Sequence, residues 1–156
     1  MEYSTNSCAL AHSLTDPAAV EQAVMNVAER SFFAFAESAV PMQTATIDGH
    51  QSTITAAVSF LGPSSGSMRV TMSEALTREL AQMFAGDPDM ELTPADVIDM
   101  AGEFANMVTG AWLTAVDSRS TYNLSAPVVT AVSTTPPVAL VMQINSQPVW
   151  LAWSAE

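Results

Sequence analysis

Four residues in the middle third of the chain have types and a spacing that could do chemistry together. Asp99, Glu103, Asn106 and Gly110 follow one another at intervals of four, three and four residues. In an α-helix these intervals place all four on one stripe, because residues three and four apart lie on the same face. A carboxylate and an amide placed this way can enter the same cleft of a substrate or partner. We call these four residues the polar stripe, and Gly102 lies just beside it.

The polar stripe is an unfavourable sequence for a helix that merely faces water. The two glycines and the asparagine of this segment together lower helix stability by roughly 2–3 kcal/mol relative to alanine. Small residues flanking a carboxylate and an amide suggest a flat surface that another backbone approaches closely. The residues alone leave an alternative, in which the glycines allow helix–helix packing and the polar pair is simply exposed. Asp99 is as readily structural as functional.

Other catalytic and metal-binding patterns are absent from the sequence. There is no G-x-S-x-G elbow, no P-loop and no G-x-G-x-x-G turn. His12 and His50 stand apart from other ligands, so we expect both to be surface side chains. The acidic run Asp87, Asp89 and Glu91 lacks the glycine and the final glutamate of an EF-hand loop. We therefore expect a solvated loop there, and no metal bound by this chain itself.

Charge and composition exclude several classes of function. The 156 residues include 4 Lys and Arg against 16 Asp and Glu, for a net charge of −12. Nucleic-acid backbones and anionic lipid surfaces require clustered positive charge, so we expect neither as a partner. Hydrophobic residues make up 49% of the chain, enough to exclude disorder. We predict a single domain over residues 1–156, with a flexible tail over 1–15.

Two further features concern location and assembly. Cys8 is the single cysteine, so neither an internal disulfide nor a zinc site can form. No signal peptide is visible, and we expect a cytoplasmic protein. The segment 120–155 contains no charged residue, but its prolines and polar side chains are not typical of a membrane span. Its many Val and Thr residues indicate buried strands instead. An exposed strand edge in this segment would need cover, which favours a homodimer.

Local signals predict three helices that could position the stripe. Asp16-Pro17 provides a cap and a first-turn proline for a helix over 17–37. Ser73 and Gly86 bracket a second helix over 74–85. Thr93-Pro94 starts the third, over 94–115, which carries the polar stripe.

The remaining segments read as strands. Alternating and β-branched residues predict strands over 42–49, 51–60, 67–72, 122–134, 137–145 and 147–154. A turn is expected at Asn145-Ser146. The order of elements predicts an α+β fold, in which an antiparallel β-sheet of about six strands, in two three-stranded meanders, has long helices packed mainly on one face.

The spacing D-x3-E-x2-N-x3-G in 99–110, on a helix between two blocks of strands, resembles the signature of the CheC/CheX/FliY family of bacterial chemotaxis phosphatases. CheC-like members carry two copies of this motif on two helices. Here the first helix contains Asn26, but Ala23 occupies the place of the glutamate. A single copy is similar to the CheX branch. The family pattern also has a proline downstream of the asparagine, and Pro127 is the candidate motif proline.

The resemblance implies an aspartyl-phosphate phosphatase that acts on a phosphorylated CheY-like receiver, in chemotaxis or another two-component pathway. Asn106 would orient the attacking water and Glu103 would pair with the lysine of the receiver, so these two are the predicted catalytic residues. Asp99 would contact the rim or support Glu103, while Gly102 and Gly110 would let the receiver approach. Mg²⁺ would be held by the receiver, and this chain would need no cofactor of its own. The resemblance also implies a homodimer.

Two other functions fit the same residues. One is a receiver-binding or flagellar-switch-like interaction module without catalysis, since related domains of flagellar switch proteins serve as assembly surfaces. The other is a structural or sensory accessory protein whose polar stripe forms a dimer seam. The intact glutamate and asparagine favour the phosphatase over the binding module, and the dimer seam stays open.

Overall fold

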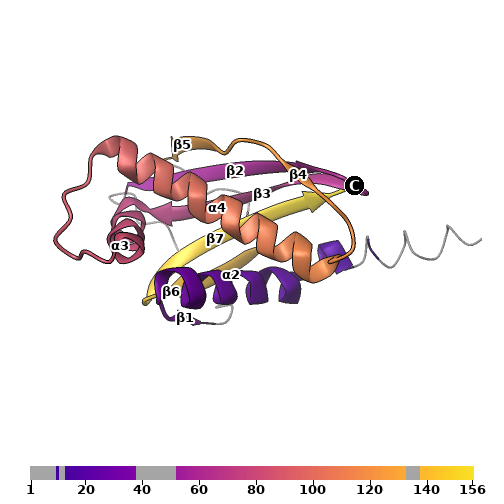
Figure 1. Ribbon diagram of the computed structural model, residues 1–156, viewed down its shortest axis with the longest axis horizontal. Helices are drawn as coiled ribbons and strands as arrows, with labels where there is room; N and C mark the ends of the chain where they lie inside the picture. The colour runs from indigo at the N-terminus through magenta and orange to yellow at the C-terminus, as the bar shows by residue number, and fades with distance from the viewer. Residues whose placement is uncertain (1–9, 11–12, 38–51, 133–137) are drawn as a thin grey trace, which may run out of the picture.

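The computed structural model describes residue 10 and the ranges 13–37, 52–132 and 138–156. Within these ranges it contains three named helices and seven strands. They are α2 (Pro17–Phe32), β1 (Ala36–Glu37), β2 (Thr53–Leu61), β3 (Ser65–Ser73), α3 (Glu74–Ala85), α4 (Pro94–Val116), β4 (Asn123–Leu124), β5 (Val128–Val132), β6 (Leu140–Ile144) and β7 (Gln147–Ala155). The strands form one antiparallel sheet, and α2 and α4 lie across one face of it (Figure 1). The predicted α+β fold class is confirmed.

The two blocks of strands join into a single sheet. Its order is β1-β6-β7-β3-β2-β4, and β5 also pairs with β2. The β6–β7 hairpin turns at Asn145 and Ser146, whose φ angles of 49° and 65° suit a two-residue hairpin turn. This turn was expected. The second predicted meander is wrong, because β5 pairs with β2 and not with β6. The edge of β6 away from β7 pairs with β1, and the edge of β2 away from β3 pairs with β4 and β5.

Two predicted boundaries near the N-terminus need correction. The first helix ends at Phe32 and not at residue 37, because Phe33 adopts the left-handed conformation with φ 52°. Ala36 and Glu37 then pair with β6. The predicted tail is too long, since residues 13–15 are helical and Leu14 is fully buried. The predicted strand over 42–49 lies outside the described residues, as do Cys8, His12 and His50.

The helices that carry and flank the polar stripe begin and end as predicted, to within a residue. The hydroxyl of Ser73 accepts from the Leu76 amide at 3.0 Å, and Gly86 closes α3 with φ 68°. At the start of α4, the Asp96 carboxylate accepts from the Thr93 backbone N–H at 2.7 Å and the Thr93 hydroxyl accepts from the Asp96 N–H. These hydrogen bonds to Thr93 lower the pKa of Asp96, because they stabilise its charged carboxylate.

α4 packs against both the sheet and α2. Phe104, Val108 and Trp112 on α4 are fully buried, and α4 crosses β2 and β3 in Figure 1. The ring of Trp112 meets Phe60 of β2 edge to face, with 5.5 Å between ring centroids. None of the helices in the described ranges combines the length and the apolar content needed to span a bilayer. This packing leaves one side of α4 free, and the polar stripe lies on that side.

Candidate functional site

The structure brings the polar stripe together on the outer side of α4. Asp99 and Glu103 are exposed, while Asn106 and Gly110 are half-buried. Because the four residues follow helical spacing, neighbours along the stripe have Cβ atoms about 5–6 Å apart. The stripe runs between the β4–β5 segment on one side and α3 with the loop after it on the other. A partner that reaches the side chain of Glu103 is therefore also close to that of Asn106.

Gly102 serves a contact within the chain. It is buried, and an added Cβ would lie 3.1 Å from the Cβ and 3.3 Å from the Cγ of Pro127. Pro127, the candidate motif proline, immediately precedes β5. The expectation that Gly102 leaves room for a partner is therefore wrong, since that room is filled by Pro127. The contact instead fixes the β4–β5 segment against α4 at the border of the stripe.

Gly110 differs from Gly102. A Cβ added at this position would be 4.0 Å from the nearest atom, Cδ1 of Leu124, which is an ordinary van der Waals contact. Packing among the described residues therefore does not require glycine here. The prediction that Gly110 lets a partner approach stays open to test.

The side-chain amide of Asn106 makes no hydrogen bond to the described residues. Its Oδ1 atom is buried without a hydrogen-bond partner, and none of the hydrogen bonds among the described residues involves the amide. A buried unpaired polar atom costs about 1–3 kcal/mol and is uncommon in folded proteins. Asn26 on α2 is unlike it, because its Oδ1 accepts from Gln22 Nε2 at 3.2 Å. The amide of Asn106 therefore has no partner among the described residues, and its oxygen lies buried at the border of the stripe.

Glu103 has no cationic partner in the described part of the chain. The ion pair found there joins Arg78 to Glu74 within α3, at 2.8 Å. The exposed carboxylates of Glu103 and Asp99 are therefore available to a cation brought by another molecule. Over the same described ranges, no cluster of three or more His, Cys, Asp or Glu side chains is placed to hold a metal ion.

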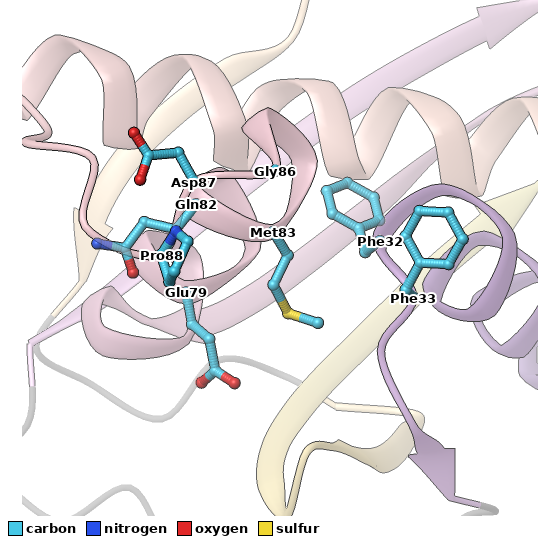
Figure 2. Close-up of a pocket in the computed structure, with 8 residues that line it drawn as sticks. All are labelled: Phe32, Phe33, Glu79, Gln82, Met83, Gly86, Asp87 and Pro88. Carbon is cyan, nitrogen blue, oxygen red and sulfur yellow. The ribbon is translucent and has the colours of Figure 1, made fainter.

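A pocket of about 420 Å³ between the end of α2 and α3 is lined by no residue of the polar stripe (Figure 2). Met83 projects from α3 between this helix and the rings of Phe32 and Phe33. Both carboxylates that line the pocket accept hydrogen bonds within the chain. Glu79 accepts from Asn145 Nδ2 at 2.9 Å and from Gln147 Nε2 at 2.7 Å, and Asp87 Oδ1 accepts from the Asp89 N–H at 3.0 Å. The bonds of Glu79 tie α3 to the β6–β7 turn.

A family model described as chemotaxis phosphatase CheX matches residues 54–138. That range is more than half of the 156 residues and contains the whole of α4 together with Pro127. The chain belongs to the CheX family. The matched range includes Glu103 and Asn106 of α4. A search of curated proteins finds no match.

Solved structures of chemotaxis proteins share the fold. The chemotaxis protein CheX of Vibrio vulnificus is 21% identical with a TM-score of 0.66, over 89% of this chain and 95% of that one. A putative chemotaxis protein of Desulfovibrio vulgaris Hildenborough is 19% identical with a TM-score of 0.68, over 90% and 96%. The CheX of Borrelia burgdorferi, solved in a complex with CheY, BeF3 and Mg²⁺, is 11% identical with a TM-score of 0.61, over 89% and 96%.

Proposed function

We propose that this chain removes the phosphoryl group from the aspartyl phosphate of a CheY-type receiver protein. The observation that carries the proposal is the amide of Asn106, whose Oδ1 has no partner among the described residues, one helical turn from the exposed carboxylate of Glu103, which has no cationic partner among them either. Membership of the CheX family supports the reaction. The complex of the Borrelia burgdorferi CheX with CheY supports the class of partner.

The reaction needs little covalent chemistry from the catalyst. A water oxygen attacks the phosphorus, the bond between phosphorus and the aspartyl oxygen breaks, and inorganic phosphate leaves a free carboxylate on the receiver. Acceleration comes mainly from holding the water in line and stabilising charge. An amide suits this task because it offers both donors and an acceptor. Asn106 orients the water, while carboxylates of the receiver hold the Mg²⁺ that neutralises phosphoryl charge.

Glu103 fixes the position of the receiver on α4 and does not itself act on the phosphoryl group. Its carboxylate is exposed on the same stripe as Asn106, so a receiver lysine paired with it would fix how the receiver sits on α4. Charge pairing across an interface orients the partners and suppresses wrong ones. Asp99, one turn earlier, is a further anionic contact or a support for Glu103.

Replacing Glu103 by glutamine removes this charge while keeping the size of the side chain. We expect the KM for the phosphorylated receiver to rise about tenfold, with a smaller change in kcat, because a single charge pair at an interface contributes on the order of 1–3 kcal/mol. Glu29→Gln is the matched control, since it removes one exposed carboxylate from α2 and should leave both constants unchanged. An unaltered KM in Glu103→Gln would contradict the assigned role.

The proposal is tested by phosphate release from a phosphorylated CheY-type receiver with Mg²⁺, measured with and without this protein. We expect release well above the receiver's own rate. No acceleration by the folded protein, across several receivers, would overturn the proposal. Receiver binding without acceleration would make the chain a non-catalytic binding module.

A further inference from the structure

A hollow of about 330 Å³ lies directly beside the polar stripe. It is an open depression lined by α3, the loop after α3, and α4. Phe84, Met90, Leu92 and Met100 give it apolar walls, and Asp99 and Glu103 lie at its α4 side. Glu103 therefore belongs both to the stripe and to the border of the hollow. The one sign of this hollow in the sequence is that two large apolar residues, Phe84 and Met90, flank the acidic segment 87–89.

The loop that forms one wall of the hollow is held in place by side chains of α3. Gln82 Nε2 donates to the Met90 carbonyl oxygen at 3.2 Å, and Arg78 Nη1 donates to the Leu92 carbonyl oxygen at 3.4 Å. The Met90 N–H donates to the Asp87 carbonyl oxygen at 3.3 Å. The wall is thus positioned before any partner arrives, which reduces the ordering cost of binding.

The walls of the hollow remain partly open to solvent. Phe84 is 53% exposed although its ring packs on Phe32, with centroids 5.5 Å apart, and Met90 is 36% exposed. Large apolar side chains grouped around a concavity are unusual on a surface that has no binding role. Next to them, Asp99 and Glu103 have no cation among the described residues. An occupant that suits both features has an apolar body beside a positive charge.

We propose that this hollow receives an apolar side chain of the receiver, next to the receiver lysine that Glu103 binds. The inference rests on the proposed function and extends it, because it assigns a second contact to the same partner. The hollow and the stripe are continuous through Glu103 and Asp99. A second copy of this chain suits the site less well, since it has no lysine, four arginines and a net charge of −12. The hollow is therefore a docking contact that sets affinity and partner choice, while Asn106 serves the reaction.

The test compares Met90→Ser, which removes an apolar wall, with Met90→Leu, which keeps it. Met90 lies in a loop, and both variants should fold like the wild type. Binding is measured with a CheY-type receiver loaded with beryllium fluoride and Mg²⁺, and turnover with the phosphorylated receiver. We expect Kd and KM to rise about tenfold in Met90→Ser with kcat unchanged. Met90→Leu should stay within about twofold of the wild type. Phe35→Ser, which removes a side chain 65% exposed outside the hollow, should change neither constant.

The possible results separate this inference from the proposed function. A wild type that accelerates phosphate release, with Met90→Ser equal to it in Kd and KM, would overturn the docking contact and leave the phosphatase proposal standing. A loss of kcat alone in Met90→Ser would also overturn it, because a docking contact acts on binding. A wild type that neither binds nor dephosphorylates the receiver would overturn both.

Discussion

Replacing Asn106 by alanine is expected to lower receiver dephosphorylation by about 100-fold or more while leaving the fold intact. The amide is the group in the proposed site that can both donate to and accept from a water molecule. Removal of one preorganised hydrogen-bonding group at a reacting centre commonly costs about 100–1000-fold in rate. Binding of the receiver should persist, because Glu103 and the apolar hollow beside it are untouched.

The same substitution should not reduce stability. In the protein alone Asn106 makes no hydrogen bond among the described residues, and its Oδ1 is buried. Alanine removes this unpaired oxygen and is also the better helix former. We expect the free energy of unfolding to stay equal or to rise by about 1 kcal/mol. Lost activity together with equal or greater stability is typical of a residue kept for function at the expense of the fold.

The matched control for this variant is Asn26→Ala on α2. Asn26 is also a half-buried helical asparagine, but its amide is bonded to Gln22 and Ala23 stands where a glutamate would be required. Its replacement should leave phosphate release unchanged. Single-turnover phosphate release and urea unfolding, measured on both variants, check the two halves of the prediction. Wild-type activity in Asn106→Ala would rule out the assigned mechanism.

Local sequence signals were sufficient for the elements that carry the stripe. The caps at Ser73, Gly86 and Thr93 act within a few residues of the helix ends they define, so α3 and α4 could be predicted closely. The end of α2 could not, because neither glycine nor proline occurs at Phe33 to signal its left-handed conformation. Likewise, Ala36 and Glu37 are extended because they meet β6, a partner far away in the sequence.

In the candidate site too, features within one helix could be predicted from the sequence, whereas contacts between distant segments could not. Helical periodicity was enough to place Glu103 and Asn106 on one face. The role of Gly102 depends on Pro127, which a different part of the chain brings over it. The apolar hollow requires α3, its loop and α4 in their folded positions, so spacing within α4 gives no sign of it. The expected homodimer concerns contacts between chains and stays a prediction.

Replacing Gly66 by alanine is expected to destabilise the whole domain. Gly66 lies in β3, paired with Phe60 of β2 on one side and Ala155 of β7 on the other. An added Cβ would overlap the Ser154 carbonyl oxygen and would lie 2.7 Å from the Phe60 ring. The carbonyl belongs to the strand backbone and cannot move without disturbing the ladder between β3 and β7. We expect a loss of about 3 kcal/mol or more, at the upper end of overpacking effects.

Gly110→Ala is the control, because it replaces a glycine by alanine at a position where the added Cβ overlaps no other atom. Its Cβ would be 4.0 Å from the nearest atom, in the interior of α4, so we expect the free energy of unfolding to rise by about 1 kcal/mol. Urea unfolding of both variants measures the two opposite changes. Wild-type stability in Gly66→Ala would show that β3 and β7 can separate locally without cost.

The position of Phe60 links this substitution to the candidate site. Its ring lies between Gly66 and Trp112 of α4, meeting Trp112 edge to face at a centroid distance of 5.5 Å. A shift of Phe60 would therefore press on α4 near its C-terminal end, about two turns from Asn106. If this contact sets the position of the stripe, the folded fraction of Gly66→Ala should show a lower kcat than the wild type. An unchanged kcat per folded molecule would instead confine the role of Gly66 to the stability of the sheet.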